Sequence, residues 1–486
     1  MHVSANLEEA LRELRDERDD LMLWVDQICI NQEDEMERAY QVQQMKQIYA
    51  EAACVIAWVG PAANNSDIVL AQLNSVGEKA HIETGALDKK SFEDMVDHTF
   101  ANFLPALADA RSLETVSAAF HHFCKRSYWR RLWVIQEFAV AQKVKVACGT
   151  ARISYQMLRN ALDSIAHILY YLEDPSDTGK NDARVEIGYT IVKAYNSSFS
   201  SFIDSIITRP HRYQNSSLNE NSLFHVLISS LVLESDYNHP ECSDPRDRIF
   251  AVLGLADDAI VFDNFPDYRN SCEYVYTEAA KRLLNQGHID IFSFFQFPRN
   301  LPMPTWVPDW RMMTFAPIAY DPWRDGFAFS ASGNSHSHQK ITSEDSESIS
   351  LRGTVVDTIK ESGSVWHPNW LGSLDPRASQ KYLSEIRAFC AQSSRIDLED
   401  EEMETSRIAI ADWDRAGDLG VTANTLDSYR RLLTEFTASH AAQQQQSTYD
   451  NDTWYRRAMQ LLRSSRPFIS ILLWLALRPP MLRSAM

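Results

Sequence analysis

Glu137 and Trp133 have the clearest capacity for chemistry in this sequence. They stand four positions apart in the run RLWVIQEF, which is typical of a helix, so the two side chains share one helical face. An indole beside a carboxylate raises the pKa of the acid and offers a flat surface on which a ligand can stack. The alternative is structural: Glu137 could form an ion pair with an arginine, and the candidates are Arg38, Arg130 and Arg131.

Four further side chains near the N-terminus are candidates. Asp26 interrupts the apolar run LMLWVDQICI, where an unpaired carboxylate is costly, so it either caps the following loop or lines a site. Glu37 and Arg38 stand at a helix start, where they could interact with the helix dipole or form an ion pair with a distant charge. Cys29 has no nearby histidine and is predicted to be buried rather than nucleophilic. Four tryptophans are predicted to belong to the core: Trp24, Trp58, Trp129 and Trp133.

The composition excludes several classes of protein. The chain of 486 residues has 47 Lys+Arg against 66 Asp+Glu, and its net charge of -19 argues against nucleic-acid binding. The 7 cysteines form no CxxC pair or Cys/His cluster at metal-ligand spacing, so no metal site is predicted. The N-terminus is charged and lacks a signal-peptide core, which favours the cytoplasm. The longest apolar run, PFISILLWLAL, falls short of the roughly 20 residues that span a membrane, and we expect it to be buried or interfacial.

The pattern of apolar residues predicts an α/β fold at the N-terminus. Residues 7–18 are expected to form an amphipathic helix, and residues 21–30 a strand. A helix from about residue 34 to 52 and the apolar run CVIAWVG would then complete a strand, helix, strand unit, for which parallel pairing is strongly favoured. KVKVACG is predicted to be another strand.

Four regions follow from these patterns and from changes in composition. Residues 1–150 carry the α/β pattern, and residues 151–325 are mainly helical. Residues 326–348 are rich in Ser, Gly, Asn and His, which is typical of a flexible linker. Residues 349–486 are predicted to be a small mixed region, partly disordered around the acidic run DLEDEEMET and the tract QQQQ.

Three passages closely resemble the sequence blocks of fungal heterokaryon incompatibility (HET domain) proteins. They are residues 23–60, the run RSYWRRLWVIQEFAVA, and the run DPRDRIFAVLGLA. HET domains usually open with a further strand carrying a block like SYVWG, and this block is missing, so the resemblance implies an N-terminally truncated HET domain over residues 1–150. The candidate family residues in register with the first two blocks are Trp24, Asp26, Cys29, Asn31, Gln32, Glu37, Arg38, Arg131, Trp133 and Gln136.

The resemblance also implies a fold and a candidate catalytic residue. HET domains are thought to look like Toll/interleukin-receptor (TIR) domains, which have a flavodoxin-like parallel sheet. RLWVIQEF resembles the TIR helix that begins with a Trp-x-x-x-Glu pattern, and in enzymatic TIR domains this glutamate cleaves nicotinamide from NAD. By that correspondence Glu137 is the candidate catalytic residue and NAD the candidate substrate, with no other cofactor expected.

Three functions remain open at this point. The family implies a signalling protein of non-self recognition, akin to innate immunity, that triggers programmed cell death through self-association or through another incompatibility protein. The second is a TIR-like NAD glycohydrolase, in which Glu137 would stabilise an oxocarbenium-like transition state. The third, which the missing first strand favours, is an inactive scaffold or truncated pseudo-effector.

Overall fold

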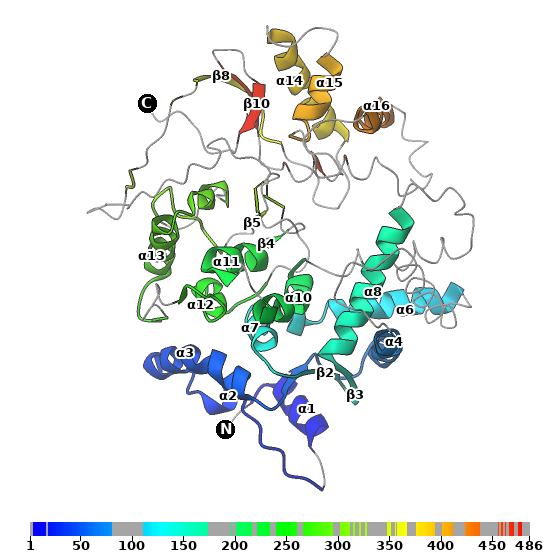
Figure 1. The fold of residues 1–486 in the computed structure, drawn as a ribbon, viewed down its shortest axis with the longest axis vertical. Coiled ribbons are helices and arrows are strands. Elements are labelled where there is room, and N and C mark those ends of the chain that lie inside the picture. Colours follow the sequence, from blue (N-terminus) through cyan, green and yellow to red (C-terminus); the bar gives the residue numbers. More distant parts are fainter. Residues whose placement is uncertain are drawn as a thin grey trace. The chain divides into compact units, whose positions relative to one another are not determined.

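The computed structural model divides into two compact units, Met1–Val275 and Tyr276–Met486 (Figure 1). The predicted boundaries at residues 150, 325 and 348 remain a prediction. The residues that the structure describes are 3–15, 18–79, 110–173, 195, 201–215, 221–233, 240–259, 266–294, 302–311, 314–315, 320–321, 326–327, 348–350, 355, 357–366, 376–393, 401–411, 423–437, 455, 458–459, 462, 466–470 and 475–478.

A small mixed sheet organises the first unit. Its strands lie in the order β1 (Val55–Trp58), β2 (Val144–Cys148), β3 (Ala151–Ser154). β1 and β2 are parallel, and β3 returns antiparallel along β2 after a turn at Gly149, whose φ is 53°. The predicted strands in CVIAWVG and KVKVACG are therefore confirmed, and so is a mixed α/β fold. The sheet is small and mixed, and the TIR-like parallel arrangement is not confirmed.

The first helix packs on this sheet. α1 (Ala5–Leu14) confirms the amphipathic helix predicted near the N-terminus. Ser4 caps it, because its side chain accepts a hydrogen bond from the backbone N–H of Leu7 at 3.3 Å. Ala10 packs against Trp58 of β1 and Ala147 of β2, so the apolar face of the helix covers the sheet.

The strand predicted over residues 21–30 is wrong. Leu21 and Met22 are 52% and 98% exposed, so the beginning of this apolar run is not buried in a sheet. At Asp26 the chain turns into a one-turn helix, α2 (Asp26–Cys29), closed by a bond from the N–H of Cys29 to the carbonyl of Val25 at 2.8 Å. An apolar run becomes a strand only where a neighbour satisfies its backbone groups, and no strand among the described residues pairs with this run.

The long helix before β1 is confirmed as α3 (Glu35–Glu51). Its N-cap is Asp34, whose Oδ1 accepts hydrogen bonds from the N–H groups of Met36 and Glu37 at 2.9 and 3.1 Å. The helix ends at Glu51 with Ala52 as its C-cap, and β1 begins shortly afterwards at Val55.

One arginine fixes the loop that follows β1. The guanidinium of Arg126 donates to the carbonyls of Val59, Pro61 and Ala63 at 3.2, 2.8 and 3.2 Å. Gly60 has a φ of 114°, and a Cβ there would lie 2.8 Å from Nη1 of Arg126. The loop can approach the arginine this closely only because residue 60 is a glycine.

Helices make up most of the remaining first unit. α7 (Val134–Ala139) packs against α3, α10 and α12, and Figure 1 shows α7 beside α10. The other helices are α4 (Ser66–Lys79), α6 (Ala110–Cys124), the 3-10 helix η2 (Ser127–Arg130), α8 (Tyr155–Glu173), α10 (Ser201–Asn215), α11 (Leu223–Leu231) and α12 (Asp247–Leu253), and α13 (Cys272–Asn285) runs from this unit into the next.

The second unit has its own core. Trp366 stacks on Tyr382, and the indole Nε1 of Trp366 donates to the carbonyl of Met459 at 2.8 Å. Its longer elements are α14 (Pro376–Gln392), α15 (Glu401–Ile408), α16 (Ala423–Thr437), β8 (Ile359–Ser362), β9 (Arg466–Ser470) and β10 (Leu475–Arg478). Its short elements are η5 (Ile289–Phe294), β5 (Thr314–Phe315), β6 (Tyr320–Asp321) and β7 (Gly326–Phe327), while β4 (Val232–Leu233) belongs to the first unit.

Two sequence expectations in the second unit can be compared with these elements. The second half of the acidic run, residues 401–405, lies in α15, where its carboxylates are paired: Glu401 with Arg387, Glu402 with Arg430 and Glu404 with Arg407. The first half, residues 397–400, lies outside the described residues. The run PFISILLWLAL contributes to the antiparallel strands β9 and β10. Most of the predicted linker and the QQQQ tract lie outside the described residues. Among the described helices, none has the length and hydrophobicity needed to traverse a membrane.

Candidate functional site

Glu137 is a buried carboxylate in α7. The residue is 7% exposed, and its Oε2 accepts a hydrogen bond from the hydroxyl of Tyr128 in η2 at 3.0 Å. Burial raises the pKa of Glu137, and this effect outweighs the opposing effects of the Arg131 charge and the Tyr128 hydrogen bond. The aromatic residue that forms a hydrogen bond with Glu137 is thus Tyr128. The indole Nε1 of Trp133 donates instead to Asp247, at 3.2 Å.

Charged and phenolic groups from three other elements surround this carboxylate. Arg131 follows η2 and lies 3.7 Å from Oδ2 of Asp26, measured from Nη2. The negative charge of Glu137 raises the pKa of Arg131. Burial raises the pKa of Tyr49 in α3, and the charges of Glu137 and Asp26 raise it further. The site therefore combines two carboxylates, a guanidinium and two phenols.

The three arginines proposed as partners of Glu137 separate in the structure. Arg130 forms an ion pair with Glu241, and Arg38 forms one with Asp244 at 3.4 Å. Arg131 is the arginine whose charge acts on Glu137. The expectation of an ion pair between Arg38 and a distant charge is thus met by a residue 206 positions away.

Replacing Glu137 with glutamine should stabilise the protein at neutral pH. The amide oxygen can still accept the Tyr128 hydrogen bond, while the cost of a buried charge disappears. Because the folded-state pKa of Glu137 is raised above its ordinary value of 4.5, wild-type stability falls as the pH rises from that value through the folded pKa. Each unit of elevation costs about 1.4 kcal/mol. We expect a higher urea midpoint for Glu137→Gln at pH 7 and equal midpoints near pH 4. A lower midpoint at pH 7 would mean that ionised Glu137 is net stabilising.

The polar residues between α2 and α3 close their own loop. The backbone N–H of Asn31 donates to Oε1 of Glu37 at 2.9 Å, and Oδ1 of Asn31 accepts from the N–H of Glu33 at 3.2 Å. The side chain of Gln32 donates to the carbonyl of Asp26 at 3.2 Å. These contacts explain why amide and carboxylate side chains stand at these spacings, and they give Asn31, Gln32 and Glu37 a structural role in the loop.

Two further candidates differ in their surroundings. Trp24 is half-buried and meets Tyr49 edge to face, with the ring centroids 5.8 Å apart. Through Tyr49 it lies next to the group of side chains around Glu137. Cys29 is exposed, and the expectation that it is buried is wrong. Cys29 lies in α2, which is a short surface turn rather than a buried strand, and this explains its exposure.

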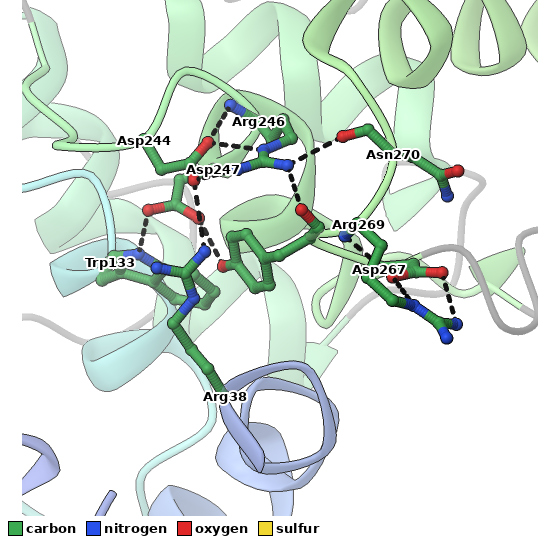
Figure 2. A network of polar contacts seen from close by, with 9 residues as sticks. Arg38, Trp133, Asp244, Arg246, Asp247, Asp267, Arg269 and Asn270 are labelled. Atoms are coloured by element: carbon green, nitrogen blue, oxygen red, sulfur yellow. Dashed lines mark hydrogen bonds and ion pairs between the residues drawn. The ribbon is translucent and has the colours of Figure 1, made fainter. Parts of the chain in front are cut away.

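A second polar network lies around Arg38 and a turn at Asp244 (Figure 2). Nε and Nη2 of Arg246 donate to the carboxylate of Asp244 at 2.8 and 2.7 Å, and Nη1 donates to the carbonyl of Asn270 at 2.7 Å. Burial alone would raise the pKa of Asp244, but the hydrogen bonds and charge of Arg246, with the charge of Arg38, lower it overall. The guanidinium of Arg38 stacks 3.8 Å above the ring of Tyr268.

Asp247 connects this network to α7. The carboxylate is 8% exposed and accepts hydrogen bonds from the Tyr268 hydroxyl at 2.6 Å and the Trp133 indole at 3.2 Å. Burial raises the pKa of Asp247 despite both bonds. Burial and the charge of Asp247 likewise raise the pKa of Tyr268. Trp133 is therefore held by a carboxylate from the later part of the unit.

Gln136 is the buried amide between α3 and α12. With the amide oriented to satisfy both ends, its nitrogen donates to the carbonyl of Ala251 at 3.1 Å and its oxygen accepts from the N–H of Lys46 at 2.9 Å. A Cβ at Gly254 would lie 2.9 Å from the nearer terminal atom of the Gln136 amide, so the glycine gives the amide room.

The first part of the chain is similar to a known protein family. Residues 1–137 match the family model described as heterokaryon incompatibility protein (HET). Residues 1–137 are therefore similar to the HET family. The chain is also 26% identical, over 400 residues, to heterokaryon incompatibility protein 6, OR allele, of Neurospora crassa, an alignment that covers 75% of this chain and 55% of the relative. The chain thus spans about half the length of this relative. No solved structure matches it.

All ten candidate family residues lie within this HET region, and they take part in different contacts. Asp26 and Arg131 are among the charged groups around Glu137, and Trp24 contacts Tyr49 beside them. Arg38 contacts Asp244, and Trp133 contacts Asp247. Among the described residues, no group of three or more His, Cys, Asp or Glu side chains could hold a metal ion.

Several residues of the two networks were not predicted from the sequence. Tyr128 lies in the second family block but was not singled out, although a tyrosine in a Trp-rich, Arg-rich run is a candidate partner for a buried acid. Asp244, Arg246 and Asp247 lie in DPRDRIFAVLGLA, a block that the resemblance located without assigning roles. Tyr268 carried no sequence signal.

Proposed function

We propose that this chain is a heterokaryon incompatibility factor that recognises a non-self partner and triggers programmed cell death. The observation that carries the proposal is the match of residues 1–137 to the HET family. The similarity to heterokaryon incompatibility protein 6 supports it, because that alignment extends well beyond the HET region. The partner is another incompatibility protein or a second copy of the chain, inside the cytoplasm.

Cell death after fusion tests this proposal. The full chain would be expressed conditionally in a filamentous fungus, and viability of fusion cells would be scored against tester strains of different incompatibility types. We expect death with some testers. Arg131→Ala, which changes the surroundings of Glu137, should reduce killing, whereas Arg269→Ala, which removes an exposed ion pair with Asp267, should not. Survival with every tester, despite a folded wild-type protein, would contradict the proposal and favour an inactive scaffold.

The second candidate is NAD cleavage at Glu137. This function is favoured by the burial of Glu137, with a raised pKa, beside Arg131 and Asp26, because carboxylates with shifted pKa values are frequent at functional sites. In this reaction the bond from ribose to nicotinamide breaks, nicotinamide leaves as a neutral base, and water adds to the ribose carbon with release of a proton. A carboxylate stabilises the developing positive charge.

Nicotinamide release by the purified full chain distinguishes the second candidate from the first. The assay would be run at several protein concentrations, because self-association could be required. Release by wild type that falls at least 100-fold in Glu137→Gln, but persists in Glu278→Gln, would support the enzyme. Glu278 is a matched control because its carboxylate pairs with Lys281 outside the site. Absence of release at every concentration would leave the signalling function alone.

A further inference from the structure

Residues 240–247 reach back onto the loop that carries Arg131. The N–H of Leu132 donates to the carbonyl of Glu241 at 2.9 Å, and the N–H of Glu241 donates to the carbonyl of Arg130 at 2.5 Å. The side chains of Arg130 and Glu241 also form an ion pair. Both chain neighbours of Arg131 are therefore fixed by one residue that lies outside the matched HET region.

The same segment holds the start of α7. Asp247 accepts the indole hydrogen bond of Trp133. The carbonyl of Trp133 in turn accepts hydrogen bonds from the N–H groups of Gln136 and Glu137 at 3.0 and 3.2 Å. Because α7 has only 6 residues, its position depends strongly on what holds its first turn.

These two attachments bear on whether Glu137 is accessible. Tyr128 and Glu137 stand on either side of the loop of residues 130–133, and both are buried. A shift of this loop would separate the Tyr128 hydroxyl from the carboxylate. We propose that residues 240–247 form a clamp that keeps the Glu137 carboxylate closed to solvent, and that release of the clamp opens the site. The described structure is then the closed state, and partner binding to the clamp is the event that would open it. Its biological meaning rests on the proposed function of Glu137.

Carboxyl labelling tests the clamp in the full chain without any assay of NAD. Carbodiimide coupling of glycine ethyl ester marks accessible carboxylates, and trypsin releases LWVIQEFAVAQK, in which Glu137 is the sole acidic residue. Glu241→Pro removes both the N–H and the carboxylate of residue 241, whereas Glu241→Ala removes only the carboxylate. We expect labelling of Glu137 to rise at least fivefold in Glu241→Pro and to rise less in Glu241→Ala.

A second pair of variants covers the case in which the proline variant does not fold. Trp133→Phe removes the indole donor to Asp247 and keeps a ring, and Trp366→Phe makes the same change in the second unit. Labelling should rise in Trp133→Phe and stay at the wild-type level in Trp366→Phe. Wild-type labelling in folded Trp133→Phe would overturn the clamp, as would a rise spread equally over all carboxylates. Raised labelling without nicotinamide release would uphold the clamp and reject the NAD-cleaving function.

Discussion

Trp129→Ala is expected to lower the free energy of unfolding of the first unit by about 3–5 kcal/mol. Trp129 is 1% exposed and meets Phe123 and Phe138 with ring centroids 5.7 and 6.0 Å apart. It also borders a small apolar cavity that Leu158 and Ile203 help to line, so the truncation would enlarge an existing void. Urea unfolding followed by far-ultraviolet circular dichroism measures the loss.

Trp129→Phe is the matched control for this truncation. Among the described residues the indole Nε1 of Trp129 is buried without an acceptor, so the replacement removes a polar group that contributes no bond. We expect this variant to lose no more than about 1.5 kcal/mol. Equal losses in both variants would show that the indole N–H, rather than the volume of the ring, is what the core requires.

Asp247→Ala is expected to cost about 2–4 kcal/mol, because it leaves two buried donors, the hydroxyl of Tyr268 and the indole of Trp133, without their acceptor. Asp247→Asn keeps one acceptor oxygen and should cost roughly half as much. The measurement is again the urea midpoint at pH 7. A neutral Asp247→Ala would mean that water replaces the carboxylate, contrary to the tight geometry around it.

The sequence predicted the local elements of the HET region well. Residues 34–52 carried an apolar periodicity, and the structure has α3 there. The run CVIAWVG was long enough and apolar enough to indicate β1. In contrast, residues 21–30 have the composition of a strand, but whether such a run pairs depends on a neighbour, which its own composition does not specify.

The candidate site could be predicted only where its residues are close in sequence. Glu137 stood out because it shares a helix with Trp133, and the structure does bury it. The bond from Trp133 to Asp247, however, joins residues 114 positions apart. No spacing rule within one helix or strand contains such a contact, so the acceptor of the Trp133 indole could not be predicted from the sequence. The position of the later block could be located by resemblance, but its contacts depend on the fold.

The contact between Arg38 and residues 244–268 also has a consequence for how the chain folds in time. A ribosome adds roughly 5–20 residues per second, so the later segment emerges some ten seconds or more after Arg38 and α3 have left the exit tunnel. During that interval the Arg38 guanidinium and the face of α7 lack the groups they contact in the finished protein. We expect nascent chains halted before residue 240 to bind chaperones, and chains halted well beyond Asn270 to be released. The contacts of the HET region would then be completed only after residues 240–270 have been synthesised.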